Sequence, residues 1–280
     1  MKNFEGYLSR IGMTLIHRSP NRETLVTVMD SHSRAIAFEN FDVVMGKHIS
    51  INGSDIEQKM VDGLRGGYCF EQNTLLKMAL EKMGFTVAPF LARVRWGKSD
   101  DCDGPNTTFT HLVLKVKTQE GNDYLVDVGF AGTNSVEPID LNVGQDPQYL
   151  PEGTFRVVPS KHPGFHVLEL FVNNDEWRPL YEWRDDEQSP IVDLECSNWY
   201  SCTYPHARFT TQLFASRIIG YERHHILNDQ YVIRMGHGIN KEVKTETITS
   251  KARLLELIDT VFEIKLKDTD GIDRYLHKQS

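Results

Sequence analysis

The chain has 280 residues, 40% of them hydrophobic and 25% charged, with a formal net charge of -8. This is the composition of an ordinary globular protein, long enough for about two domains and for a core that needs no disulfide or metal staples, and it argues against a disordered chain. The negative charge argues against binding to nucleic acid or to anionic membranes.

The first 85 residues carry helical patterns. Apolar residues recur at spacings of three and four within residues 1–16 and again within 22–34. A further helix is predicted from Cys69 to Met83, and Gly84 stands where a helix C′ glycine is expected.

From Thr86 onward the pattern changes to strands, and a last helix follows with Ser250 as its candidate N-cap. Helices first, strands next and a mixed tail favour an α+β fold over a βαβ repeat. The predicted strands are Thr86–Trp96, Thr110–Lys117, Asn122–Phe130, Phe155–Pro159, Phe165–Val172, Trp177–Tyr181, Phe209–Ile218, Tyr231–Met235 and Lys244–Ile248.

Four cysteines without a CxxC pair, no recognisable secretory leader and no apolar run of membrane-spanning length indicate a reduced, cytoplasmic protein. Cys69 has the most informative surroundings, because Gly66 and Gly67 allow a sharp turn and close approach to a ligand just before a helix begins. The first turn of a helix favours the thiolate, which is the nucleophilic form. The alternative is a buried structural cysteine behind a turn.

A thiol nucleophile needs a base and a group that orients the base. His111 opens one predicted strand and Asp127 lies inside the next, where an unpaired carboxylate would be costly. A three-residue loop, 119–121, with Gly121 in the left-handed position places His111 opposite Gly129 and makes His111 and Asp127 diagonal neighbours on one face. A two-residue loop would put them on opposite faces and undermine a Cys-His-Asp triad.

These residues resemble those of the arylamine N-acetyltransferases. The resemblance covers Arg65–Asn73 (RGGYCFEQN), Thr110–Leu112 and Val126–Phe130, with Ala37–Asn40 and Leu91–Val94 as further matches. Order and spacing agree across the first 130 residues, and the remainder matches weakly. The resemblance implies a helical bundle (1–86) carrying the nucleophile, a β-barrel (87–204) carrying the histidine and aspartate, and a C-terminal α/β lid (205–280).

The resemblance also implies a ping-pong acyltransfer of xenobiotic metabolism, without a metal. Acetyl-CoA acylates Cys69, and an aromatic amine or hydrazine then takes the acetyl group, with His111 as base and Asp127 as orienting group. Backbone N–H groups, that of Cys69 among them, would bind the oxyanion. Thr107, Thr108, Thr110, Gly129 and Phe209 would border the CoA groove, and Phe38 and Phe130 the amine or acyl pocket. Arg65 and Glu39 are interpreted as a structural ion pair beneath the site.

Three positions depart from the family pattern: Ala37 replaces a proline, Ala131 a glycine and Ala207 a serine. The last two leave the acyl donor open among acetyl, propionyl and malonyl. An acidic protein that binds an anionic donor must also supply local positive charge, for which Arg208, Arg217 and Lys98 are candidates.

Other functions use the same residue order. A cysteine hydrolase or transglutaminase-like enzyme, an amide synthase that takes a carrier-bound acyl chain, and a non-catalytic homologue stay open as alternatives. Acidic neighbours disfavour a thiolate at Cys102, Cys196 and Cys202 are expected to be ordinary thiols, and His224-His225 lacks the ligands of a metal site. We expect a monomer or homodimer without nucleic-acid or membrane partners.

Overall fold

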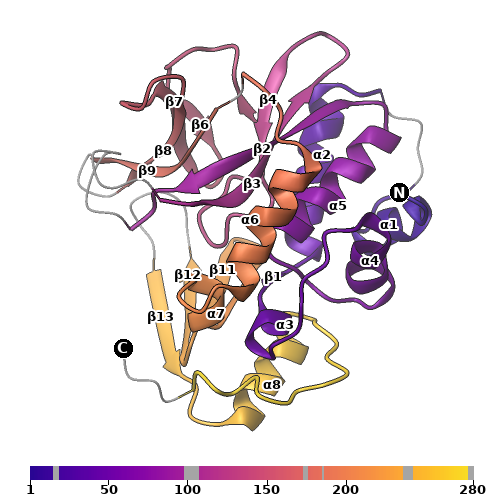
Figure 1. Ribbon diagram of the computed structural model, residues 1–280, viewed down its shortest axis with the longest axis vertical. Helices are drawn as coiled ribbons and strands as arrows, with labels where there is room; N and C mark the ends of the chain where they lie inside the picture. The colour runs from indigo at the N-terminus through magenta and orange to yellow at the C-terminus, as the bar shows by residue number, and fades with distance from the viewer. Residues whose placement is uncertain (15–18, 98–106, 173–175, 185, 236–241, 277–280) are drawn as a thin grey trace.

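The computed structural model describes residues 1–14, 19–97, 107–172, 176–184, 186–235 and 242–276. In this part of the chain, helices from the N-terminal third lie beside one antiparallel sheet, and a second sheet lies below it (Figure 1). The helices are α1 (Phe4–Arg10), α2 (Arg22–Ala35), α3 (Phe41–Val44), α4 (Gly53–Ile56), the π-helical segment η1 (Glu57–Asp62), α5 (Cys69–Lys82), α6 (Ile191–Thr203), α7 (Arg208–Thr211) and α8 (Lys251–Thr260).

The first sheet is an almost closed barrel of eight strands in the order β5-β4-β3-β2-β9-β8-β7-β6. The side-chain amide of Gln148 bridges the two edge strands, since it accepts from the Asp140 N–H (2.8 Å) and donates to the Asp140 carbonyl (2.9 Å). The strands are β2 (Thr86–Val94), β3 (Phe109–Lys117), β4 (Asp123–Val126), β5 (Ile139–Asp140), β6 (Gln148–Leu150), β7 (Gly153–Pro159), β8 (His166–Val172) and β9 (Glu176–Trp183).

The second sheet has five strands in the order β1-β10-β11-β12-β13. Its first strand comes from the N-terminal region, because Phe38 pairs with Ser216 across more than 170 residues of sequence. One face packs on α8, where Ala215 and Ile226 join Leu254 in a buried apolar cluster. The strands are β1 (Phe38–Glu39), β10 (Phe214–Ile219), β11 (Glu222–Leu227), β12 (Gln230–Met235) and β13 (Glu242–Thr247).

Alternation along β3 explains how helices and barrel share one sheet. Leu114 and Val116 point outward and pack on Leu76 and Leu80 of α5, while Val113 points into the barrel interior. One face of β3 therefore packs on helix α5, and the other face lines the barrel interior.

The hairpin register predicted from the sequence is confirmed. Leu114 pairs with Val126, and Thr118 and Asn122 close a three-residue loop in which Gly121 has φ +89. Extended beyond this last pair, the same register would put residue 111 opposite residue 129. The strand prediction was wrong in one respect: β4 ends at Val126, and Asp127 follows it, because the N–H groups of Val128 and Gly129 donate to side chains instead of to β3.

Several other boundaries differ from the predictions. The first helix covers only Phe4–Arg10, and the segment predicted as a strand over Phe209–Ile218 begins with helix α7 before β10 starts at Phe214. Helix α6 and strand β11 were not predicted. The helix ends at Gly84, with φ +91, and at Ser250, whose hydroxyl accepts from the Arg253 N–H, are as predicted. Among the described residues, no helix combines the length and apolarity that a membrane crossing requires.

Candidate active site

Cys69 is the first residue of α5 and is 1% exposed. The Glu71 side chain caps this helix start by accepting from the Tyr68 N–H at 3.0 Å. The N–H groups of the first helical turn have no acceptor within the helix, so they are available to an anion beside the thiol. The thiol Sγ lies 3.7 Å from the carbonyl oxygen of Thr110.

The two glycines before Cys69 serve close packing against the protein's own backbone. Neither has a positive φ. A Cβ on Gly66 would lie 2.2 Å from the Ala37 carbonyl oxygen, and one on Gly67 would lie 2.9 Å from the Glu71 side chain. Within the protein, these glycines approach strand β1, with which Gly67 forms a backbone bridge at Phe38.

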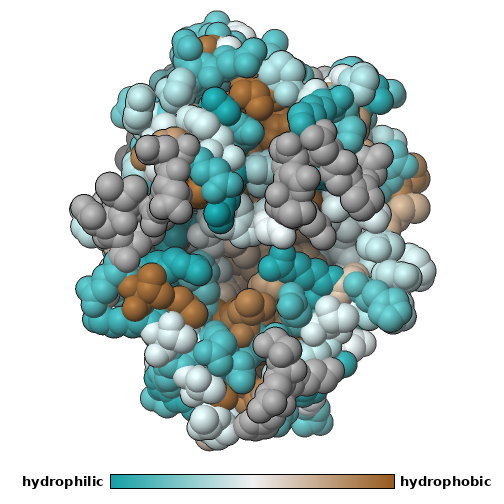
Figure 2. All heavy atoms as spheres, turned by 90° about the vertical axis from the view of Figure 1, so that its left-hand side faces the viewer, coloured by the Kyte–Doolittle hydropathy of each residue, from teal (hydrophilic) through white to brown (hydrophobic). Residues whose placement is uncertain are grey.

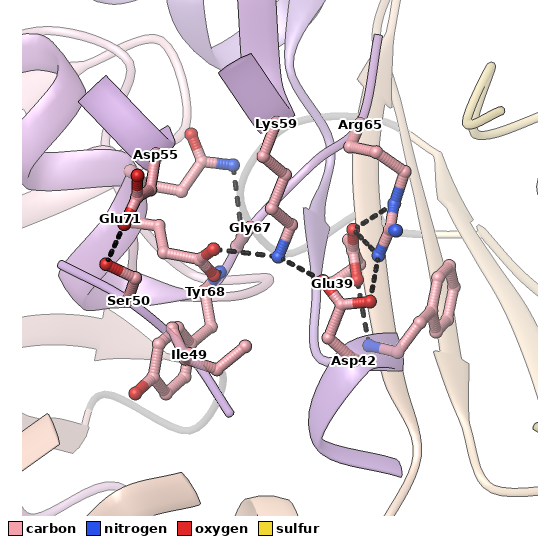
Figure 3. A network of polar contacts seen from close by, with 12 residues as sticks. Glu39, Asp42, Ile49, Ser50, Asp55, Lys59, Arg65, Gly67, Tyr68 and Glu71 are labelled. Atoms are coloured by element: carbon pink, nitrogen blue, oxygen red, sulfur yellow. Dashed lines mark hydrogen bonds and ion pairs between the residues drawn. The ribbon is translucent and has the colours of Figure 1, made fainter. Parts of the chain in front are cut away.

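A buried ionic network holds this turn from beneath (Figure 3). The guanidinium of Arg65 donates twice to Glu39 (2.8 and 3.0 Å), which confirms their predicted ion pair. The ammonium of Lys59 joins Asp42 (2.8 Å) to Glu71 (2.7 Å). Burial raises the pKa of Glu71, and Lys59 partly offsets the rise. Since each buried charge has an opposite partner, ion pairing offsets part of the desolvation cost of the network that positions the helix start.

His111 connects the thiol to a carboxylate. Its Nε2 lies 2.6 Å from Oδ2 of Asp127, and its ring packs on Phe130 and Tyr181 at centroid distances of 5.2 and 5.1 Å. Because Nε2 is engaged, Nδ1 is the nitrogen left available to Cys69, whose side chain also raises the pKa of His111. Burial lowers the pKa of His111, but the Asp127 charge and the hydrogen bond to Asp127 outweigh it and raise the pKa to about 10.

The acceptor sites of Asp127 are filled by several donors. Its Oδ1 accepts from the Gly129 N–H (2.8 Å) and from Asn73 Nδ2 (2.9 Å). Tyr181 lies beside the same carboxylate, and burial together with the Asp127 charge raises the pKa of Tyr181. Asn73 lies one helical turn after Cys69, and it also donates to the Leu112 carbonyl and accepts from the Val128 N–H. Asn73 thus ties the helix of the thiol to both strands of the hairpin.

Sequence reasoning quoted Asn73 as part of the matched motif and gave it no role; its spacing of four from Cys69 was the available signal. It missed Tyr181 entirely, because this residue reaches Asp127 from strand β9 and nothing in the local sequence marks it.

The other predicted site residues divide into two groups. Phe38 and Phe209 pack on each other, Phe209 also contacts Tyr68, and Phe130 lies on His111, so these aromatic residues surround the nucleophile. Thr107 and Thr108 are placed differently. The Thr107 hydroxyl and carbonyl contact Val94 and Arg93, Thr108 is exposed, and only Thr110 of this segment touches the thiol.

Two of the three cations proposed for the anionic donor have partners within the protein. Arg208 lies over the Phe214 ring at 4.9 Å, and Arg217 donates to Val261 and pairs with Glu263. Lys98 lies outside the described residues, as does Cys102. Cys69, Cys196 and Cys202 are free thiols. Among the described side chains no group of three or more His, Cys, Asp or Glu could hold a metal ion, and His224 instead contacts Tyr231 and Glu222.

Gly129 lies so close to the thiol that alanine is not expected to fit. An added Cβ would be 2.6 Å from the Cys69 Cα and 2.9 Å from Asn73 Nδ2. We expect Gly129→Ala to destabilise the fold by about 1–3 kcal/mol through overpacking and to impair reaction at Cys69. Urea unfolding and the alkylation rate of Cys69 measure the two effects. Gly144→Ala, which meets nothing within 4 Å but has φ +67, is the control: it should lose some stability through backbone strain and keep the wild-type alkylation rate. Equal alkylation rates of Cys69 in the two variants would contradict the steric argument.

The sequence and the fold were both compared with those of known proteins. A family model described as N-acetyltransferase matches residues 21–271. An arylamine N-acetyltransferase of Mycolicibacterium smegmatis is 35% identical over 269 residues, covering 96% of this chain and 94% of the relative. A solved structure of the M. smegmatis enzyme superposes with a TM-score of 0.88 at 32% identity, covering 98% and 97% of the two chains. The Mycobacterium marinum arylamine N-acetyltransferase in complex with CoA superposes with a TM-score of 0.88 at 28% identity and 98% coverage of both chains.

Proposed function

This chain belongs to the arylamine N-acetyltransferase family, and we propose that Cys69, His111 and Asp127 carry its acetyl transfer from acetyl-CoA to an aromatic amine or hydrazine. One observation supports the proposal above all: a single imidazole joins the buried Asp127 carboxylate to a cysteine at a helix start. This is the arrangement of a nucleophile, a base and a group that orients the base.

In the first half-reaction, the Cys69 sulfur attacks the thioester carbonyl carbon after its proton has moved to His111. Backbone N–H groups at the start of α5 bind the oxyanion that forms. The C–S bond to CoA then breaks, and His111 returns the proton to the leaving CoA sulfur. The hydrogen bond from His111 Nε2 to Asp127 keeps Nδ1 directed at the sulfur throughout.

In the second half-reaction, the amine nitrogen attacks the acetyl group on Cys69 and gives its proton to His111. The C–S bond to Cys69 breaks, and the thiol is restored. We assign Phe38, Phe130 and Phe209 to the walls of the acceptor and acyl pocket, since these rings surround the nucleophile. Phe209 of α7 packs on Phe214 of β10. This contact supports our proposal that α7 and the five-stranded sheet together form the lid.

The division of the chain into three domains, 1–86, 87–204 and 205–280, stays our prediction. A monomeric or homodimeric state also stays a prediction, as does a cytoplasmic location, in which the thiol would stay reduced. A matrix of acyl donors and amine acceptors, read by release of the CoA thiol, identifies the acyl preference and the preferred amine.

Incubation with acetyl-CoA alone tests the proposal. We expect the intact protein to gain the mass of one acetyl group on Cys69 and to release one equivalent of CoA thiol, and an aromatic hydrazine then to discharge the protein. Absence of the increment, with acetyl-CoA only hydrolysed, would favour a cysteine hydrolase. Acylation by a carrier-bound chain but not by acetyl-CoA would favour an amide synthase.

A further inference from the structure

A buried chain of hydrogen bonds crosses the helical region and ends at the turn before Cys69. Tyr7 of α1 bonds to His32 of α2, with 3.0 Å between Tyr7 Oη and His32 Nδ1, and His32 Nε2 lies 2.8 Å from Oε1 of Gln72 in α5. All three side chains are 0% exposed. Bulk water therefore cannot take the place of either hydrogen bond, and each group depends on its partner in the protein.

The direction of each hydrogen bond in the Tyr7–His32–Gln72 chain follows from Gln72. Its Nε2 lies 2.8 Å from the Ala37 carbonyl oxygen and 3.2 Å from that of Gly67, and a carbonyl oxygen can only accept. The amide therefore presents Oε1 to His32, so His32 Nε2 must carry a proton and donate it. Burial lowers the pKa of His32 to about 4, although the Gln72 hydrogen bond opposes the fall. The ring is thus neutral, and its bare Nδ1 accepts from the Tyr7 hydroxyl.

The Gln72 amide joins two backbone segments that meet beneath the nucleophile. The Ala37 carbonyl accepts from the Gly67 N–H at 3.4 Å, and the Gly67 carbonyl accepts from the Glu39 N–H at 3.1 Å. These are the hydrogen bonds between the turn and the start of β1. The NH₂ group of Gln72 donates to the same two carbonyls. It therefore ties the turn and β1 to helix α5, in which Gln72 stands three residues after Cys69.

This contact fixes the backbone immediately before the thiol. The Gly67 carbonyl is held by Gln72 Nε2, and the Tyr68 carbonyl accepts from the Gln72 N–H at 2.9 Å. The peptide group that ends in the Cys69 N–H lies between these two fixed points, so they set the direction of that N–H, which is an expected donor to the oxyanion. The sulfur is met from the barrel side by His111. The chain therefore bears on the Cys69 N–H more than on the thiol.

The Tyr7–His32–Gln72 chain lies apart from the open cleft of the molecule. A cleft of about 570 Å³ separates the barrel from the five-stranded sheet, and Figure 2 shows the hollow on that side. Its walls come from strands β8 to β12 and the end of α2, and they carry four arginines, Arg34, Arg178, Arg223 and Arg234. None of Tyr7, His32 and Gln72 is among the residues described on these walls. A change within the chain therefore leaves the charges that line the cleft in place.

We propose that His32 is a positioning residue for acyl transfer. As the Nε2–H tautomer it orients the Gln72 amide, and the amide holds the Gly67 turn so that the Cys69 N–H is directed at the oxyanion. The inference rests on the proposed function, because it names what positions a donor that this reaction needs. The hydrogen bonds of the His32 ring go to Tyr7 and Gln72, so it acts on the site through Gln72.

His32→Asn and His32→Gln form the test pair. When an amide side chain replaces an imidazole, the glutamine nitrogen takes the place of Nε2 and the asparagine nitrogen that of Nδ1, so only His32→Gln keeps the donor to Gln72. We expect His32→Asn to lower kcat and the acylation of Cys69 by p-nitrophenyl acetate about tenfold, with KM for acetyl-CoA within about twofold. His32→Gln should stay within about threefold of wild type. Alkylation of Cys69 by iodoacetamide, which forms no oxyanion, should be similar in all three proteins.

Gln72→Met provides a second variant of similar size. The Ala37 and Gly67 carbonyls keep their backbone donors in it, so folding should persist. We expect acylation as slow as in His32→Asn, and no further loss when the two changes are combined, because both break one linkage. His224→Asn is the matched control: it removes another buried imidazole, which bonds to the Tyr231 hydroxyl at 2.7 Å in the five-stranded sheet. It should lower stability in urea and leave acylation unchanged.

The outcomes separate this role from the proposed function. Equal acylation rates in His32→Asn and His32→Gln would overturn the positioning role while the acyltransferase function stands. Losses that multiply in the double variant would overturn it too, as would alkylation that falls as far as acylation in His32→Asn, since that is a general loosening of the site. If His32→Asn does not fold, Gln72→Met against His224→Asn decides by the same two reagents. Failure of wild type to be acylated by acetyl-CoA would instead overturn the proposed function.

Discussion

Cys69→Ser is expected to lose acetyl transfer by at least about a thousandfold, measured as release of CoA thiol with a hydrazine acceptor. A hydroxyl is far less acidic than a thiol, and a thioester exchanges readily only with a thiolate. The change should leave folding intact, because the side chains are nearly equal in size and Sγ makes only a weak contact with Thr110 at 3.7 Å. The intact variant should also gain no acetyl mass from acetyl-CoA.

Cys202→Ser is the matched control for this loss. Cys202 is also buried, at 8% exposure, and belongs to the same apolar cluster as Cys69. Its thiol contacts Trp199 and Thr203 of its own helix region and also lies near the Tyr68 side chain. We expect full activity from this variant. A Cys69→Ser protein that still released CoA at the wild-type rate would show that Cys69 is not the nucleophile and would favour a non-catalytic role for the motif.

Asp127→Asn is expected to reduce acetyl transfer by about 10³–10⁴ while the fold persists. Oδ1 of Asp127 accepts from two N–H donors, so the oxygen of the new amide must stay there and its NH₂ must face His111 Nε2. His111 would then carry its proton on Nδ1, which is the nitrogen that must accept a proton from Cys69. The replacement thus keeps the shape and reverses the tautomer of the base.

The pH dependence of stability gives Asp127→Asn a second readout. Although burial opposes it, the pKa of His111 is raised to about 10 in the wild type, chiefly by Asp127. A raised pKa contributes stability that is fully present below the unfolded value, about 6.5, and is lost as the pH rises through about 10. The free energy of unfolding attributable to His111 should therefore fall between these limits by up to about 1.4 kcal/mol per pH unit.

Urea unfolding at about pH 7 and about pH 9 measures that slope. We expect a steeper decline with pH in wild type than in Asp127→Asn, where His111 loses the charge that holds its proton. Identical slopes in the two proteins, together with unchanged acetyl transfer, would show that Asp127 does not control His111.

Prediction from the sequence was most accurate where local interactions determine the structure. Gly121 in a three-residue loop determines the β3–β4 register, and that register brings His111 and Asp127 together. Likewise, Gly84 and Ser250 mark helix ends that depend little on tertiary packing. A left-handed glycine and a capping hydroxyl both act within one helical turn. Helix α7 was mistaken for a strand because its four residues are too short to show a helical period.

By itself, then, the amino-acid sequence predicted a nucleophile, its base and an orienting carboxylate, and it indicated the class of reaction that the family match confirms. Only the tertiary structure decided what surrounds them: Tyr181 reaching Asp127 from β9, Asn73 joining α5 to the hairpin, and Arg223 standing opposite Arg234 on two neighbouring strands that line a cleft. A helix start or a hairpin is written within a dozen consecutive residues, whereas a cleft is lined by strands and a helix end from distant parts of the chain. The charge of -8 gave no sign of that cleft, because a net charge is a sum over the chain and a binding potential depends on where each charge lies.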